Sequence, residues 1–293
     1  MKPLYRQFLR LAFALAVLIF ASYALISYIA EPRYKGRSFT SWLREYEQNL
    51  WDESESARAI LAIGTNAAPT LAKMVLAQES FSLARVAKKL RIPIEFLASS
   101  EPYENHRLAM NGFRLLGPTA SNALPFLSSV ALEPDAYYAY EAIQAIGQPA
   151  LPLLNQMLST TNHEAKRYAV WSILNINFKD FGALSNLLIY PDPQVRGEAY
   201  LCVPSRHYIP QADRLEILLR GIGDPQTFAS QRAVLGLRQL GLYATNALPR
   251  LYELQSTTNA RLAQEITTTI QNIEKRVRIE QTSMNKATAL SAK

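Results

Sequence analysis

The sequence predicts an all-α protein: a right-handed α-solenoid of antiparallel helix pairs, preceded by one N-terminal transmembrane helix. Two observations lead to this prediction. A short phrase recurs along the chain, and an uncharged apolar run stands near its start. The copies of the phrase read "TNAAPTL" at 65–71, "SNALPFL" at 121–127, "TNALPRL" at 245–251 and, more loosely, "GQPALPLL" at 147–154.

The apolar run covers 11–30 and follows a basic leader, 1–10. It carries no charge. At about 1.5 Å of rise per residue it would span about 30 Å, the thickness of the hydrocarbon core of a bilayer. The alternative is a cleaved signal peptide, because a weak small-x-small cleavage site exists at Ser22–Ala24. The apolar core of a signal peptide is usually shorter, about 7–15 residues, so we favour an uncleaved signal anchor.

Both flanks of this run are basic, and positive charge favours the cytoplasmic side of a membrane. The short leader favours a cytoplasmic N-terminus. We therefore expect a single-pass protein of the inner or plasma membrane, with a juxtamembrane linker at 31–37 and the folded body on the non-cytoplasmic side. The flanking basic residues are Lys2, Arg6 and Arg10 on one side and Arg33, Lys35 and Arg37 on the other.

A glycine precedes each copy of the phrase, and we predict that it ends a helix, because glycine readily adopts the left-handed conformation after a C-cap. Apolar residues stand one and four places before each glycine, and a tiny residue stands five places before it. This spacing makes one helical face apolar and lets a neighbouring helix approach closely. The glycines are Gly64, Gly117, Gly147 and Gly241, and the tiny residues are Ala59, Gly112, Ala142 and Gly236.

Each copy also contains a proline, which fits the first turn of a second helix because its missing N–H would have no intrahelical acceptor there. A leucine follows two places after each proline: Leu71, Leu127, Leu154 and Leu251. We expect Asn66, Asn122 and Asn246, three places before their prolines, to be N-caps, which would put those prolines at N3. The phrase is thus predicted to be the hinge between two antiparallel helices.

Less regular copies fill the gaps between the clear ones. At 172–188, Asn177 stands in place of the glycine and Ser185 in place of the proline. A further hinge is expected near 204, and extra helices are expected in 79–108. A period of about 30–40 residues with paired helices is typical of an α-solenoid.

The two ends of this region are predicted to be caps. The range 38–50 would form a first helix that buries Trp42, Leu43 and Tyr46. A longer last helix has one apolar stripe and polar remaining faces, as the end of a solenoid needs. The stripe is Leu262, Ile266, Ile270, Ile273 and Val277, and the polar residues are Arg261, Gln264, Gln271 and Lys275. We assign the solenoid to 38–280 and a polar C-terminal tail to 281–293.

The stretch "AILAIGTNAAPTL" at 59–71 and its copies resemble HEAT-repeat proteins, as does "YPDPQVRGEAY" at 190–200. In the latter, Asp192 and Pro193 would start a helix. More narrowly, "YKGRSFTSWLREY" at 34–46 followed by "AIGTNAAP" resembles a group of membrane-anchored bacterial HEAT-repeat proteins of unassigned function. The resemblance covers about 34–273 and implies an architecture, with no particular chemistry.

The net charge of +7 invites a nucleic-acid interpretation. However, the excess lies in the leader and in 274–293, and the body between them is almost balanced. A phosphate-backbone binder concentrates positive charge on its folded face, so the distribution argues against nucleic acid. The one basic run of the body, "ARVAKKLRI" at 84–92, would fit acidic lipid or nucleic acid, or the solvated face of a helix.

No catalytic, metal or cofactor constellation stands out in the sequence. The three histidines, His106, His163 and His207, lack the spacing of metal ligands, and we expect Cys202 to be a buried, inert thiol. The tyrosines of "DAYYAYEA" at 135–142 fit packing between repeats or a binding face. Capping explains the carboxylates at the predicted turns, which are Asp135, Asp192 and Asp224.

We therefore expect a non-catalytic, membrane-tethered scaffold whose helical-repeat surface binds protein partners, with 11–30 as the membrane contact and no cofactor. The polar positions after each proline are the candidate partner-binding residues: Lys73, Ser129, Gln156 and Glu253. The alternative is a HEAT-like enzyme or enzyme subunit, because the resemblance extends to bilin lyases and to an alkylpurine DNA glycosylase. The first would need a bilin and the second a basic groove, and the sequence indicates neither.

Overall fold

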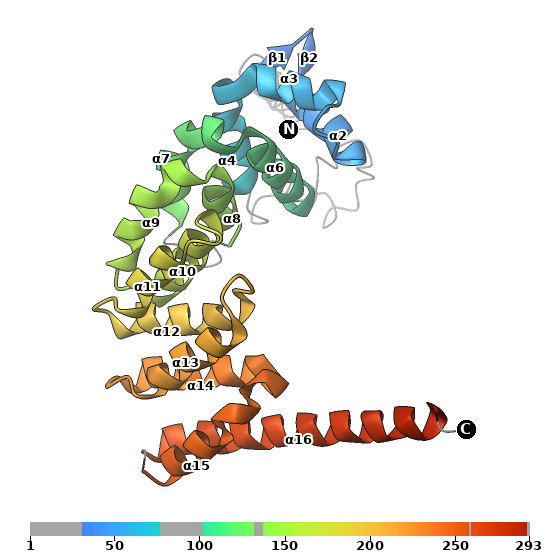
Figure 1. Ribbon diagram of the computed structural model, residues 1–293. Helices are drawn as coiled ribbons and strands as arrows, with labels where there is room; N and C mark the ends of the chain where they lie inside the picture. Colours follow the sequence, from blue (N-terminus) through green and yellow to red (C-terminus); the bar gives the residue numbers. More distant parts are fainter. Residues whose placement is uncertain (1–30, 77–101, 132–136, 258, 292–293) are drawn as a thin grey trace, which may run out of the picture. The chain divides into compact units, whose positions relative to one another are not determined.

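The computed structural model describes residues 31–76, 102–131, 137–257 and 259–291. They fall into two compact units with a boundary between Ala150 and Leu151, and each unit is described by itself. Both units consist of α-helices joined by short turns and 3₁₀ segments (Figure 1). The all-α prediction is therefore confirmed, and the described residues contain just one pair of two-residue strands.

Several predictions fall on residues outside these ranges. They are the leader 1–10, the transmembrane segment 11–30, the basic run 84–92, Asp135 and most of 79–108. In the ranges that are described, no helix combines the length and the apolar character that crossing a membrane would require.

The first unit begins with a β-hairpin in the range that we assigned to a linker. β1 (Arg33–Tyr34) pairs with β2 (Arg37–Ser38) in antiparallel register. The hairpin is fixed to the helix that follows it, α2 (Phe39–Asn49), by Trp42. Its indole Nε1 donates a hydrogen bond to the Tyr34 carbonyl at 3.1 Å, and the Arg37 guanidinium lies 3.8 Å from the centre of its ring. The residues 33–38 are thus part of the folded unit.

Helix α2 buries Trp42, Leu43 and Tyr46, as predicted. The remaining helices of this unit surround α6 (Pro102–Leu116), which packs against α2, α3, α4 and α8. Those helices and 3₁₀ segments are α3 (Glu55–Ile63), η1 (Gly64–Ala67), α4 (Ala68–Leu76), η3 (Gly117–Ala123), α7 (Leu124–Val130), α8 (Tyr137–Ile146) and η4 (Gln148–Ala150).

The second unit has two sets of helices. In one set, each helix packs against the next: α10 (His163–Ile176), α12 (Pro193–Cys202), α14 (Thr227–Leu240) and α16 (Ala260–Ser291). The other set packs against these one by one: α9 (Leu151–Leu158), α11 (Phe181–Leu188), α13 (Gln211–Ile222) and α15 (Leu248–Thr257). The 3₁₀ segments η5 (Val203–Ser205) and η6 (Gly241–Ala247) follow α12 and α14.

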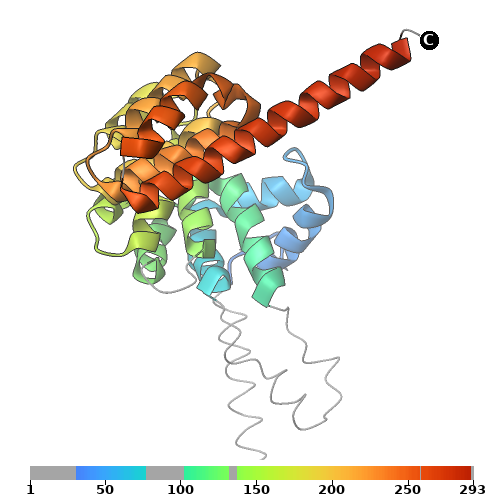
Figure 2. The same ribbon diagram turned by 90° about the horizontal axis from the view of Figure 1, so that it is seen from below.

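The last helix follows the predicted pattern but is longer than expected. Leu262, Ile266, Ile270 and Ile273 are buried, and Val277 is half-buried. Helix α16 continues past residue 280 to Ser291, so most of the range that we assigned to a polar tail is helical (Figure 2).

The hinge glycines have the positive φ angles that we predicted. The φ angles are 56° at Gly64, 51° at Gly117, 80° at Gly147 and 61° at Gly241. At Gly64 the ψ angle is −130°, and at Gly241 it is −123°. These two glycines therefore lie outside the left-handed helical region, in a mirror-image region that glycine occupies without a steric penalty.

We expect Gly117→Ala to lower the free energy of unfolding by about 1–3 kcal/mol, the usual cost of holding a residue other than glycine at an unfavourable positive φ. A Cβ at this position would have no atom within 4 Å, so the cost comes from the backbone alone. Gly117→Asn should lose less, because asparagine tolerates positive φ better. Urea unfolding of the three proteins checks this order, and a Gly117→Ala variant as stable as the wild type would contradict it.

The predicted N-caps are wrong. Asn66, Asn122 and Asn246 lie inside the 3₁₀ segments η1, η3 and η6, which make no side-chain cap hydrogen bonds. Each proline is the second residue of its helix, one place earlier than N3. The physical reason is that the i→i+3 hydrogen bonds of a 3₁₀ turn lead directly into the helix, so no side chain has to cap it.

The predicted hinge at Asn177 and Ser185 is also wrong in its register. Asn177 has a φ of −97° and donates its side-chain N–H to the Ile173 carbonyl at 2.9 Å, which caps α10 without a left-handed residue. The positive φ, 77°, lies at Lys179. Asp180 then caps α11 by accepting the Gly182 N–H at 2.8 Å. Helix α11 therefore starts at Phe181, and Ser185 is its fifth residue.

The predicted close approach of helices is confirmed in both units. A Cβ at Gly112 would lie 2.6 Å from Cδ2 of Leu71, and one at Gly236 would lie 2.6 Å from Cδ2 of Leu218. The leucines that follow the hinge prolines (Leu71, Leu127, Leu154 and Leu251) have no exposed surface. The repeated phrase thus supplies the packing between helices in each unit.

Candidate functional site

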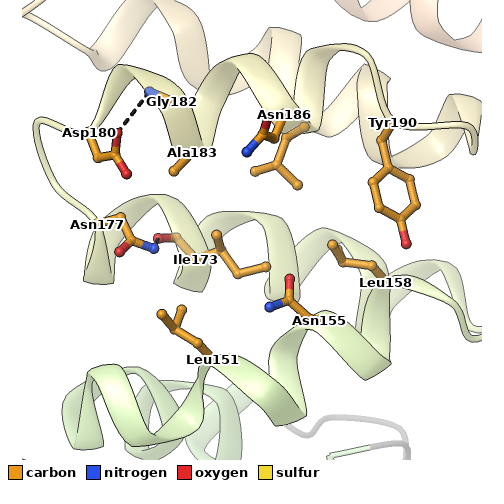
Figure 3. Close-up of a pocket in the computed structure, with 11 residues that line it drawn as sticks. Leu151, Asn155, Leu158, Ile173, Asn177, Asp180, Gly182, Ala183, Asn186 and Tyr190 are labelled. Carbon is orange, nitrogen blue, oxygen red and sulfur yellow. Dashed lines mark hydrogen bonds between the residues drawn. The ribbon is translucent and has the colours of Figure 1, made fainter.

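A groove opens in the second unit between α9, α10 and α11, with a volume of about 340 Å³ (Figure 3). We call it the α9–α11 groove. Helical spacing explains why its residues share one face of each helix. They are Leu151, Asn155 and Leu158 on α9, Ile173 and Asn177 at the end of α10, and Asp180, Gly182, Ala183, Asn186, Leu187 and Tyr190 from the α11 segment.

The floor of the groove is aliphatic. Leu158, Ile173 and Leu187 are 2%, 6% and 4% exposed, so they belong to the core and show only an edge to the groove. Leu151 is half-buried. Two large apolar side chains next to the groove are also exposed. Phe178, in the turn between α10 and α11, is 59% exposed, and Phe181, the first residue of α11, is 49% exposed. An apolar group that entered the groove would therefore exchange its contact with water for contact with apolar side chains, which is favourable.

Two polar side chains of the groove are already engaged by the helix ends. Asn177 donates to the Ile173 carbonyl at 2.9 Å, and Asp180 accepts the Gly182 N–H at 2.8 Å. Asp180 contributes the single carboxylate of the lining. Because this carboxylate caps α11, it is held at the helix N-terminus.

Two other polar side chains are free to bind a ligand. Asn155 on α9 and Asn186 on α11 point toward one another across the groove (Figure 3). Both are exposed, and the described residues give neither side chain a hydrogen bond. Tyr190 adds a hydroxyl whose oxygen lies 3.5 Å from Oγ of Ser159.

The four residues that we predicted to bind a partner are all exposed. Lys73 on α4 and Ser129 on α7 belong to the first unit, whereas Gln156 on α9 and Glu253 on α15 belong to the second. Figure 1 places α9 and α15 at opposite ends of the second unit. Glu253 accepts a hydrogen bond from Arg250 at 2.7 Å. The partner-binding role of these residues stays a prediction.

Two ion pairs connect successive helices of the second unit. The Lys166 ammonium on α10 contacts the Asp192 carboxylate, the N-cap of α12. One helix further on, Arg196 donates to both oxygens of Asp224 at 2.7 and 2.8 Å. In each pair, the basic residue is the fourth residue of its helix. The carboxylate lies just before the N-terminus of the helix that packs against it. These donors lower the pKa of both carboxyls, against the effect of burial.

A buried carboxylate lies between three helices of the same unit. Glu198 on α12 has no exposed surface. Its Oε1 is 3.3 Å from Nη2 of Arg232 on α14 and 3.9 Å from Nε2 of His163 on α10. Neither carboxylate oxygen is aligned for a hydrogen bond. Burial raises the pKa of Glu198, while Arg232 and His163 act in the opposite direction.

The histidines contact aromatic or charged neighbours, each in a different place. The His106 ring stacks on Tyr138 with centroids 4.0 Å apart, His163 meets Phe228 edge to face, and His207 lies 3.4 Å from Arg214. In the parts of the chain that the structure describes, no three His, Cys, Asp or Glu side chains are grouped as a metal site needs.

Cys202 is 4% exposed, and burial raises the pKa of its thiol to about 12. Because the thiolate is the reactive form, we expect Cys202 to react with iodoacetamide at pH 8 orders of magnitude more slowly than an exposed cysteine, and only through unfolding. Mass spectrometry of the labelled protein checks this. The matched control is Ser129→Cys in a Cys202→Ala chain, which should label quickly. Rapid labelling of native Cys202 would contradict the buried, inert assignment.

Comparisons with known proteins add little to this geometry. No protein-family model matches the chain, and no curated protein matches it. Among solved structures, the crystal structure of an engineered protein covers 81% of this chain and 97% of its own, at 18% identity and a TM-score of 0.33. We base nothing on a likeness at this TM-score.

Proposed function

We propose that this chain is a membrane-tethered scaffold of the HEAT-like α-solenoid type, which binds protein partners and catalyses no reaction. The observation that carries the proposal is the α9–α11 groove. It combines an aliphatic floor with two exposed carboxamides that have no partner within the described residues. Concave sites of this kind, mainly apolar with a few polar groups, are typical of binding sites.

Three features support the solenoid architecture. The glycine–proline units recur along the sequence, and each glycine has positive φ. In the second unit, α10, α12, α14 and α16 pack one against the next. The ion pairs Lys166–Asp192 and Arg196–Asp224 repeat one connection between successive helices. In helical-repeat proteins each repeat mainly contacts its neighbours, and their stacking creates an extended binding surface.

The groups in the groove are suited to binding. The carboxamides and the phenol of the lining can donate and accept hydrogen bonds. Covalent catalysis would need a nucleophile activated by an adjacent base, and the described lining of the groove contains no Ser, Thr, Cys, Lys or His. No observation favours the alternative of an enzyme or enzyme subunit. A chromophore that stays on the purified protein would overturn the non-catalytic assignment.

The membrane tether rests on the uncharged run 11–30. The side of the membrane on which the body lies is tested by protease accessibility of residues 34–293 in intact cells with a permeabilised outer layer. Digestion before lysis is expected, because the body is proposed to be non-cytoplasmic. Protection until lysis would reverse the proposed orientation.

The binding role is tested by two sets of substitutions that introduce or reverse a charge. One set is Lys73→Glu, Ser129→Asp, Gln156→Lys and Glu253→Lys, and the other is Asn155→Lys with Asn186→Lys in the groove. Full-length chains are purified from membranes, and bound proteins are quantified by mass spectrometry. At least one set should remove specific partners, whereas the matched control, Lys275→Glu on α16, should not. Unchanged capture in both sets would refute the scaffold.

A further inference from the structure

We infer that the α9–α11 groove binds an extended, uncharged peptide segment that presents one apolar side chain. This inference rests on the proposed scaffold function and names the class of ligand that its groove takes. It follows from the polar groups of the groove, from its floor and size, and from its charge.

The two free carboxamides match a peptide backbone. Each carboxamide carries an accepting oxygen and a donating NH₂ group. An extended chain presents C=O and N–H groups along both of its edges. Asn155 and Asn186 point toward one another across the groove (Figure 3), so a strand that lies between them would meet a donor and an acceptor on each side.

The floor and the size of the groove fit one apolar side chain with its neighbours. Leu151, Leu158, Ile173 and Leu187 supply aliphatic contacts. The volume of about 340 Å³ lies at the lower end of the range for small-ligand sites, about 300–1,000 Å³. Three extended residues span about 10 Å, which is two turns of the flanking helices. The groove therefore accommodates a short segment of a longer chain.

The charge of the groove argues against a charged ligand. Its single carboxylate, Asp180, caps α11, and the lining contains no Lys or Arg. A phosphate or an acidic peptide would enter without a counter-ion, and a basic peptide would find one carboxylate that is already engaged. Binding should therefore depend little on ionic strength.

A glycan could also bind carboxamides, but it is the less suitable ligand. Sugars usually need an aromatic face against their C–H groups. The single ring in the lining is Tyr190, whose hydroxyl lies near Ser159. The remaining floor is branched aliphatic, which suits a Leu, Ile or Val side chain better than a sugar ring.

The experiment uses the full-length chain in detergent micelles and a surface array of random nonapeptides. The best binder is then synthesised with a fluorescent label, and its affinity is measured by anisotropy. We expect the selected peptides to share a central aliphatic residue without a common charge. Asn155→Ala and Asn186→Ala should each weaken binding three- to tenfold, the loss expected for one hydrogen bond. Changing salt from 50 to 500 mM should alter the affinity less than twofold.

Two controls make the result specific. Asn66→Ala, at an exposed asparagine of η1 in the first unit, should leave affinity unchanged. N-methylation of the two amides that flank the aliphatic residue should weaken binding as the Asn→Ala variants do. Selection of charged peptides, or binding that is indifferent to Asn155 and Asn186, would overturn the inference. So would the absence of any peptide binding, or glycan binding that Asn155→Ala abolishes. If one of these contradicting results is obtained while the charge-changing substitutions at Lys73, Ser129, Gln156 and Glu253 still remove partners, the scaffold proposal survives and the peptide groove does not.

Discussion

Glu198→Ala is expected to lower the free energy of unfolding by about 2–3 kcal/mol, because it leaves Arg232 without its counter-ion and opens a cavity between α10, α12 and α14. Breaking a fully buried ion pair costs about 3–5 kcal/mol. We expect less here because the Arg232 side chain is 28% exposed. Urea unfolding followed by tryptophan fluorescence measures the change, since Trp171 reports on α10. A variant within experimental error of the wild type would contradict the structural role of Glu198.

The neutral variant Glu198→Gln separates the charge of this site from its packing. Burial raises the pKa of the folded-state carboxyl. A group with a raised folded pKa stabilises the protein at low pH, and that stabilisation is lost as pH rises through the folded pKa. The stability of the wild type relative to Glu198→Gln should therefore decrease as the pH rises above about 4, the ordinary pKa of a glutamate. An increase over the same range would mean that the attraction of Arg232 outweighs burial.

Gly221→Ala is expected to lower the free energy of unfolding by about 1–3 kcal/mol, the usual cost of overpacking a core. A Cβ at Gly221 on α13 would lie 2.8 Å from Cβ of Ala233 on α14 and 2.6 Å from the Tyr200 ring on α12. The Cβ of Ala233 cannot move away by a change of rotamer, because its position is fixed by the backbone. The helices α13 and α14 would therefore have to separate. On an exposed helix, Gly→Ala would raise the free energy of unfolding by about 1 kcal/mol. The sign of the measured change therefore distinguishes a close helix contact from an exposed position.

The matched control restores space from the other side of this contact. The double variant Gly221→Ala with Ala233→Gly should recover part of the lost stability, with the Tyr200 ring limiting the recovery. Thermal and urea unfolding of the two variants and the wild type provide the comparison. A single variant at least as stable as the wild type would show that these helices do not approach as closely as the structure has them.

The helix pairs could be predicted because their signals are local. A glycine with positive φ, a proline in the first turn and leucines at helical spacing each act within a few residues of the chain. The prediction failed where another local interaction was stronger. Asn177 caps α10 through its side chain, and Asp180 starts α11 earlier than the Ser185 alignment implied. The β-hairpin at 33–38 was missed because it depends on Trp42, which lies in the next helix.

The groove could not be predicted because it depends on which helices become neighbours. Among the polar positions after Pro152 we predicted Gln156 as a binding residue, whereas its neighbour Asn155 is the one that lines the groove (Figure 3). Asn186 gave no signal because the register of its helix was misassigned. Glu198 was also missed, since nothing in "RGEAY" distinguishes a carboxylate with no exposed surface from one on a solvated helix face.

The most direct measurement is site-specific photo-cross-linking in intact cells. A benzoylphenylalanine residue replaces Asn186 in the α9–α11 groove of the full-length chain, and in a second chain it replaces the exposed Lys275 on α16 as the control. We expect the groove position to give a discrete cross-linked product of fixed mass in the membrane fraction, which Asn155→Lys removes and the control position does not give. A product that is the same at both positions, or no product at Asn186, would contradict a partner-binding groove.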